Sequence, residues 1–133
     1  MIELVHILRA IVEAVCGGRE ENLRQCKMPP IRFSQLEQLV FDELWQKRRV
    51  VVYSTAWEMK KDLERLADLG ILKYESGEIR IENPGEFLEK TTPFVIVTRN
   101  MVAGNEYLKY VVQLIEDGTR RYAKENILAP QPV

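Results

Sequence analysis

The first stretch of the chain shows apolar residues at helical spacing: Leu4, Val5, Leu8, Ile11, Val12 and Val15. This pattern predicts a helix over residues 2–16 with a wide apolar face. Gly17 and Gly18 follow, and glycine favours the left-handed conformation that ends helices. Residues 19–30 are polar and show no period, so they are predicted to form a loop.

Residues 35–46 form a second segment with helical period. Its main apolar stripe consists of Leu36, Leu39, Val40 and Leu44. Phe41 and Trp45 lie four residues apart and make a second stripe, so this helix is predicted to pack on two sides. Ser34 with Glu37 matches a capping box at its start.

A basic triplet and a run of β-branched residues separate this helix from the next. Lys47-Arg48-Arg49 suits a helix end, where cations complement the dipole, and Val50-Val51-Val52 disfavours continued helix. A further helix is predicted over residues 55–69, capped by Ser54 or Thr55. Its apolar stripe consists of Ala56, Met59, Leu63, Leu66 and Ala67.

Two runs with a period of two flank a turn that contains glycine. Residues 71–75 and 78–82 alternate apolar and polar side chains on either side of Ser76-Gly77. Such alternation around a two-residue turn predicts a β-hairpin. Residues 31–33, Ile-Arg-Phe, favour a short additional strand before the second helix.

The C-terminal third returns to helical patterns. A helix capped by Asn105 is predicted over residues 105–125, with the stripe Leu108, Val111, Val112, Ile115, Thr119 and Tyr122. Residues 86–103 fit two structures, because Thr92-Pro93 suits a helix start whereas Phe94 to Val97 suits a strand. Residues 93–99 therefore stay open between helix and strand, with helix favoured.

Composition and charge describe an ordinary globular chain. Hydrophobic residues make up 46% of the 133 residues and charged residues 29%. The 19 basic and 20 acidic residues give a net charge of -1. A protein that coats nucleic acid without specificity carries a basic excess, so any nucleic-acid contact of this chain has to be local.

The sequence carries no readable catalytic, cofactor or metal motif. His6 is the single histidine, and Cys16 and Cys26 lack the spacing of a metal or redox pair. No glycine-rich phosphate loop and no nucleophile motif occurs. We expect no enzymatic activity, no cofactor and no metal.

The helix predicted over residues 2–16 indicates in which cellular compartment the protein is expected. Glu3, Arg9 and Glu13 interrupt its apolar face, which excludes a signal peptide or a membrane span there. A cytoplasmic protein without a membrane partner is therefore expected. Disulfides are rare in the cytosol outside hyperthermophiles, so Cys16 and Cys26 are expected to be reduced thiols.

The order of these elements resembles the winged helix-turn-helix superfamily. The residues that carry the resemblance are Asp62 to Leu72, DLERLADLGIL, which look like a recognition helix running through its glycine into the first wing strand. The resemblance implies a mostly α (α+β) fold, with a winged-helix core and a two-stranded wing over residues 1–83. Additional C-terminal helices over residues 84–133 would pack on the same domain as a dimerisation element.

The resemblance also implies double-stranded DNA as a partner, with transcription regulation as the role. The N-terminal half of the second helix of a helix-turn-helix faces the base edges. Residues 47–82 hold eight basic and seven acidic residues, a net charge of +1. The candidate DNA-binding residues are Arg48, Arg49, Ser54, Thr55, Trp57, Lys60, Lys61, Arg65, Lys73 and Arg80.

Trp57 lies on the polar side of the helix over residues 55–69. It is either an anchor in a partner interface, since buried tryptophans dominate binding hot spots, or it packs against Phe41 and Trp45. Packing is favoured, because large aromatic side chains are usually buried.

Surplus apolar surface on the last helix predicts a homodimer, the commonest soluble oligomer. Its candidate interface residues are Leu108, Val111, Val112, Leu114, Ile115 and Tyr122.

Glu58, Glu64 and Asp68 do not suit a phosphate-lined groove. The alternative function is therefore a winged-helix protein-interaction module, a subunit of a larger assembly that does not bind DNA.

Overall fold

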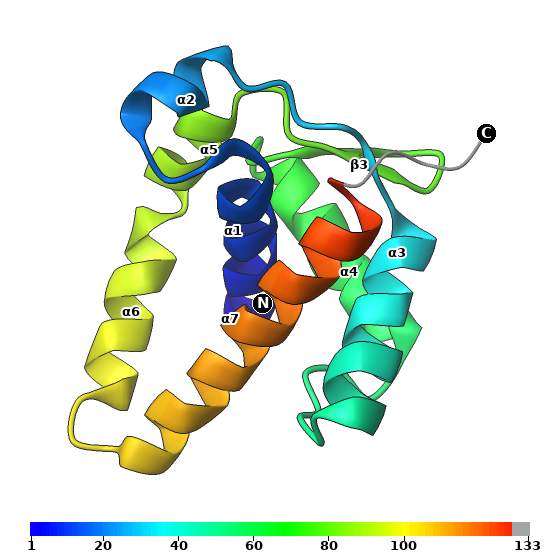
Figure 1. Cartoon of the computed structure of the whole chain (residues 1–133). Coiled ribbons are helices and arrows are strands. Elements are labelled where there is room, and N and C mark those ends of the chain that lie inside the picture. The colour runs from blue at the N-terminus through cyan, green and yellow to red at the C-terminus, as the bar shows by residue number, and fades with distance from the viewer. Residues whose placement is uncertain (129–133) are drawn as a thin grey trace.

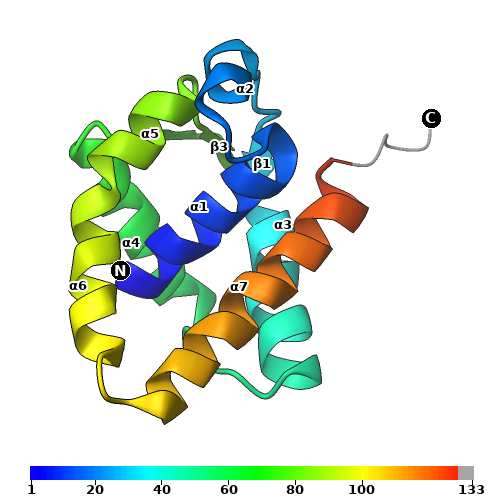
Figure 2. The same ribbon diagram turned by 60° about the vertical axis from the view of Figure 1, so that its left-hand side comes forward.

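Helix α1 (Ile2–Cys16) lies at the centre of the computed structural model, which describes residues 1–128 (Figure 1). Helices α6 (Thr92–Val102) and α7 (Glu106–Asn126) both contact it, and Figure 2 shows them diverging from a common turn with α1 between them. The wide apolar face of α1 explains this position, because a helix with so much apolar surface has to be covered on several sides. Its fully buried side chains are Leu4, Val5, Ile7, Leu8, Ile11 and Val12.

A three-stranded antiparallel sheet closes one end of the core. The strands are β1 (Ile31–Arg32), β2 (Lys73–Glu75) and β3 (Glu78–Arg80), in the spatial order β1-β3-β2. Ser76 and Gly77 both have positive φ angles, 52° and 73°, as a tight hairpin turn requires. The predicted hairpin is confirmed, although its strands are shorter than the predicted runs over residues 71–75 and 78–82. With the helices, the sheet gives the α+β class.

Ile79 lies at the centre of this sheet and is fully buried. It pairs with Ile31 of β1 on one side and with Tyr74 of β2 on the other. The strand expected over residues 31–33 ends at Arg32, because Phe33 already begins a helix.

The second helical segment begins earlier than the sequence predicts and has two parts. Helix α3 (Phe33–Glu37) continues directly into η1 (Gln38–Lys47), which has π-helical hydrogen bonding. The side-chain oxygen of Gln35 accepts a hydrogen bond from the Arg32 backbone N–H at 2.9 Å. The Ser34–Glu37 capping box is therefore wrong, since Gln35 occupies the position that Glu37 was expected to fill.

Only Phe41 of the second stripe packs against the hydrophobic core as predicted, whereas Trp45 does not. Phe41 is half-buried and Trp45 is 38% exposed, and their rings lie 6.1 Å apart, tilted against each other. The main stripe through Leu39, Val40 and Leu44 is fully buried and carries the packing of the segment.

Helix α4 (Ala56–Asp68) is close to its predicted range. The Thr55 hydroxyl accepts a hydrogen bond from the Glu58 backbone N–H at 3.2 Å, so Thr55 rather than Ser54 is the cap. Met59, Leu63 and Leu66 are fully buried, as the apolar stripe predicts.

The described part of the C-terminal third consists of helices joined by short turns. Helix α5 (Pro84–Lys90) comes first, and α6 then covers residues 93–99, so the favoured helix is confirmed there. Asn105 caps α7 by accepting a hydrogen bond from the Leu108 backbone N–H at 3.0 Å. Buried residues of α5 and α7 belong to the same hydrophobic cluster as those of α1 and α4.

The segment over residues 19–30 differs most from its prediction. It contains helix α2 (Glu20–Gln25) instead of an unbroken loop. The turn at Gly17 and this helix lead the chain back toward the end of α1, and the Cα atoms of Cys16 and Cys26 lie 5.5 Å apart.

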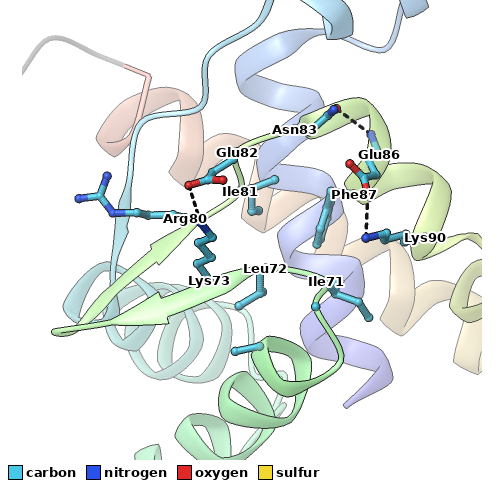
Figure 3. A pocket seen from close by; sticks show the side chains of 12 residues that line it. Ile71, Leu72, Lys73, Arg80, Ile81, Glu82, Asn83, Glu86, Phe87 and Lys90 are labelled. Atoms are coloured by element: carbon cyan, nitrogen blue, oxygen red, sulfur yellow. Dashed lines mark hydrogen bonds and ion pairs between the residues drawn. The ribbon is translucent and has the colours of Figure 1, made fainter.

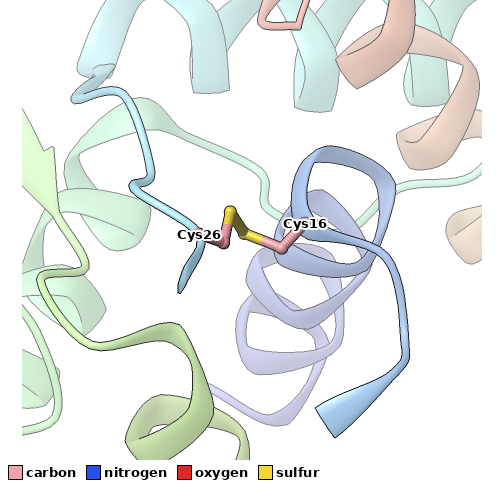
Figure 4. Close-up of a disulfide and its surroundings, with 2 residues drawn as sticks. All are labelled: Cys16 and Cys26. Carbon is pink, nitrogen blue, oxygen red and sulfur yellow. A yellow bond between two sulfur atoms is a disulfide. The ribbon is translucent and has the colours of Figure 1, made fainter. Parts of the chain in front are cut away.

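Cys16 and Cys26 form a disulfide (Figure 4). The expectation of reduced thiols is therefore wrong. It rested on the compartment, whereas the pairing follows from the chain reversal that places the two Cβ atoms together.

Within residues 1–128, no helix combines the length and the apolar character that crossing a membrane requires.

Candidate nucleic-acid interface

The connection between η1 and α4 is tightly held by its backbone. The N–H of Arg49 donates to the Trp45 carbonyl at 3.0 Å, and the N–H of Val50 donates to the Leu44 carbonyl at 2.9 Å. Arg49 has a φ of 62°, a left-handed conformation that reverses the chain. The side chain of Val50 is buried by this reversal, while those of Arg49 and Val51 are exposed.

The outward face of α4 follows from its buried stripe. Trp57, Lys60 and Arg65 are exposed on the side away from Met59 and Leu63. Trp57 is 66% exposed, so the prediction that it packs against Phe41 and Trp45 is wrong. Trp57 lies in the first turn of α4, and its ring faces away from the core.

Lys61 covers part of the Trp57 ring. Its Nζ lies 5.2 Å from the ring centroid, within the range of a cation–π contact. Glu64 is the acidic partner of Lys61, with a distance of 4.0 Å between the charged atoms. The indole and the ammonium group therefore form one exposed feature of the first two turns of α4.

The net charge changes sign between the segment that leads into α4 and the C-terminal half of α4. Residues 49–61 contain three basic residues and one acidic residue, a net charge of +2, whereas residues 62–68 contain one basic and three acidic residues, a net charge of -2. The positive end of the helix dipole adds to the basic half. The N-terminal half of α4 is thus the half that suits a polyanion.

Not all candidate cations of this region are free. Arg48 lies 3.8 Å from a Glu43 carboxylate oxygen, and Arg65 lies 2.9 Å from one of Asp62. Arg49 and Lys60, by contrast, have no ion-pair partner among residues 1–128. Ser54 is exposed beside them.

The hairpin differs from the sequence prediction in its charge pattern. Lys73 pairs with Glu82 at 3.1 Å, and Arg80 pairs with Glu78 at 2.6 Å. Glu75 stands directly opposite Glu78 next to the turn. Because both cations are neutralised and two carboxylates face each other at its tip, the hairpin does not extend the basic surface.

A cavity of about 320 Å³ lies between the end of α4, the hairpin and α5 (Figure 3). Leu72 and Phe87 form part of its wall, and Arg80 points away from it. The Lys73–Glu82 pair and the Lys90–Glu86 pair stand at its rim, the second at 2.7 Å. The charges around this cavity are thus already compensated within the protein.

Tyr53, Asp62 and the amino terminus of Met1 form a polar cluster on the inner side of α4, which the sequence did not predict. The Tyr53 hydroxyl donates to Asp62 Oδ2 at 2.5 Å, and the amino terminus of Met1 lies 2.9 Å from the same oxygen. Burial alone would raise the pKa of Asp62, but the Tyr53 and Met1 hydrogen bonds outweigh it and hold the pKa below its ordinary value. Asp62 therefore remains a carboxylate that ties the connection to α4.

Burial and the bond to Asp62 also raise the pKa of Tyr53 far above its ordinary value. Helical spacing alone could have indicated that Asp62 is buried, since it lies next to Leu63 on the inner side of α4. Nothing in the sequence indicates that Tyr53 is its partner, because they belong to different elements.

The predicted dimer residues divide into two groups. Ile115 and Tyr122 are buried within the chain's own core, so their side chains are not available to a partner. Leu108, Val111, Val112 and Leu114 are half-buried. The more exposed apolar side chains of this region are Ile96, Val97, Met101, Tyr107 and Tyr110.

Compared with known proteins, the chain matches no family model, no curated protein and no solved structure.

Proposed function

We propose that this protein is a winged helix-turn-helix protein that binds double-stranded DNA and regulates transcription. The order α1, β1, α3–η1, α4, β2, β3 and the strand order β1-β3-β2 support the winged-helix assignment. On this assignment η1 and α4 are the helix-turn-helix, α4 is the recognition helix and β2–β3 is the wing.

The charge reversal along α4 is the observation that carries the DNA proposal. A recognition helix enters the major groove with its N-terminal residues, and the net positive charge lies in that half. Lys60 and Arg49 are exposed and free of acidic partners within the described chain, so they can contact phosphates or guanine edges. Trp57 then offers an apolar ring to thymine methyl groups or to the sugar backbone.

The proposal assigns the wing a smaller role than the sequence predicts. Lys73 and Arg80 are paired with glutamates, and Glu75 and Glu78 would face the phosphates. Recognition is therefore concentrated on the connection and the first two turns of α4.

The test is a selection from a randomised double-stranded oligonucleotide pool, followed by titration of the enriched fragment at two salt concentrations. Lys60→Ala and Arg49→Asn should each weaken binding about tenfold for a base contact, or lower the salt slope by about 1 for a phosphate contact. Asparagine replaces Arg49 because it tolerates the left-handed conformation.

The matched control is Arg121→Ala, which removes an exposed, ion-paired cation from α7 and should leave binding unchanged. Absence of enrichment at low salt, or equal losses in the control and in Lys60→Ala, would refute DNA binding through α4.

A protein partner is the second candidate, and the exposure of Trp57 favours it. An exposed tryptophan rimmed by mixed charge is typical of a binding hot spot. In that case Trp57→Ala should abolish association with a co-purifying protein, while Lys60→Ala should change it little. The DNA proposal predicts a strong effect from both variants on one ligand, the enriched fragment.

A further inference from the structure

A second polar cavity lies where α6 and α7 pack against α1. Its volume is about 210 Å³. Charged side chains from three helices line it: His6, Arg9 and Glu13 of α1, Arg99 of α6, and Glu116 and Arg120 of α7. Three guanidinium groups thus meet two carboxylates in one small space.

The charges of this cavity are not fully compensated. Arg120 lies 3.7 Å from Glu13 and 3.4 Å from Glu116, so both carboxylates are engaged by one arginine. Neither Arg9 nor Arg99 forms a direct ion pair with a carboxylate among the residues that the structure describes.

Arg9 is held in place by neutral acceptors. Its guanidinium donates to the Leu88 carbonyl at 2.7 Å and to the Thr91 hydroxyl at 2.6 Å. These bonds orient Arg9 without giving it a direct ion pair. Burial lowers its pKa and outweighs the opposite effect of Glu13 and Glu116, which favour the charged form from a longer distance. Half-burying an unpaired charge is costly, which favours a bound counter-ion.

His6 also lines the cavity. Its Nε2 lies 2.6 Å from the Thr98 hydroxyl, and its Nδ1 lies 3.7 Å from Glu116. Burial lowers the pKa of His6 and outweighs the opposite effect of Glu116, so the imidazole is neutral at pH 7. The cavity then carries a net charge of +1 from three arginines and two glutamates.

We infer that this cavity binds a small oxyanion, a carboxylate or phosphate group, between Arg9 and Arg99. Guanidinium groups match the geometry of such groups with paired N–H donors. The volume admits a small metabolite rather than a polymer. Because α7 contacts both α1 and η1, an occupant would connect this site to the first helix of the proposed helix-turn-helix.

The experiment is thermal unfolding of the full chain, followed by circular dichroism. Sodium phosphate and sodium acetate are titrated separately against sodium chloride at constant ionic strength. A ligand that binds the folded state should raise the Tm by about 5 °C at ten times its dissociation constant. A rise with either anion supports the site, and the anion that acts identifies phosphate or carboxylate as the preferred group.

Three variants assign the effect to the cavity. Arg99→Ala removes an exposed side chain, so the protein should fold normally and lose the anion-dependent rise, and Arg99→Lys should retain part of it. Arg121→Ala and Lys60→Ala lie outside the cavity and should retain all of it. The inference is overturned if neither anion raises the Tm, if Arg99→Ala keeps the full rise, or if Lys60→Ala abolishes it.

Discussion

Gly118 lies where α7 crosses η1, and its lack of a side chain allows the close approach. A Cβ atom there would stand 2.8 Å from Leu44 Cδ2 and 2.8 Å from Arg48 Cδ. Leu44 is fully buried and cannot move without disturbing the core. The same contact holds Arg48 against α7, which explains why this arginine is not part of the free basic surface.

Gly118→Ala should therefore destabilise the protein, although alanine is the better helix former by about 1 kcal/mol. We expect a net loss of about 1–3 kcal/mol in the free energy of unfolding, measured by urea denaturation, because the new methyl group overpacks the contact. Arg48→Ala in the same chain should recover part of the loss. A more stable Gly118→Ala variant would show that α7 and η1 can move apart enough to accommodate the methyl group, and would contradict the prediction.

The Tyr53–Asp62 hydrogen bond is the second residue-scale feature with a measurable consequence. Tyr53→Phe should cost about 1–3 kcal/mol at pH 8, since it removes a donor from a buried carboxylate. The pKa of Tyr53 is raised in the folded state, so its contribution is complete below the unfolded value of 10.0 and is lost as the pH rises above it.

The wild type should consequently lose stability above about pH 10 more steeply than Tyr53→Phe. Urea denaturation at pH 8 and pH 10.5 measures both slopes. Equal alkaline losses in the two proteins would mean that Tyr53 does not retain its proton in the folded state.

At the scale of elements, the disulfide and α2 secure the end of α1. The bond closes a loop with a sequence separation of 10 residues, next to the segment that leads into β1. A cross-link of this length removes conformational freedom mainly from the unfolded chain. The sheet edge and the core helix are thereby connected independently of hydrophobic packing.

Reduction of the disulfide should lower the free energy of unfolding by about 2–3 kcal/mol. The measurement compares denaturation with and without a thiol reductant, and Cys26→Ala serves as the control that should not respond to reductant. If oxidised and reduced proteins unfold at the same urea concentration, the bond contributes no stability.

At the scale of the whole molecule, exposed apolar side chains gather on α6 and α7. Ile96, Val97, Met101, Tyr107 and Tyr110 are between 44% and 76% exposed. Exposed apolar side chains in such number on two adjacent helices favour an interface. We propose that the protein is a homodimer through the α6–α7 hairpin, with the contact shifted from the inner stripe of α7 to its outer face.

Sedimentation at micromolar concentration should show a species of twice 15.5 kDa. Tyr107→Glu should dissociate it, because Tyr107 is 76% exposed and its replacement leaves the monomer core intact. Ile115→Glu would be uninformative, since Ile115 is buried in the core and the variant would unfold. A wild-type species of 15.5 kDa would contradict the dimer.

The sequence by itself determined the elements whose signals are local. The stripe of α4 through Met59, Leu63 and Leu66, the Asn105 cap and the Ser76-Gly77 hairpin were all predictable. Periodicity, capping and turn chemistry act within a few residues, so they can be recognised without knowledge of the fold.

The tertiary structure alone decided which side chains meet. The Cys16–Cys26 bond, the Tyr53–Asp62 pair and the cavity between α1, α6 and α7 join residues whose proximity depends on how helices pack. The exposure of Trp57 belongs to the same class, because periodicity places a residue on a face but does not show whether a neighbouring element covers it. The Lys73–Glu82 ion pair likewise depends on the return of the hairpin, so a count of basic residues does not reveal that Lys73 is engaged.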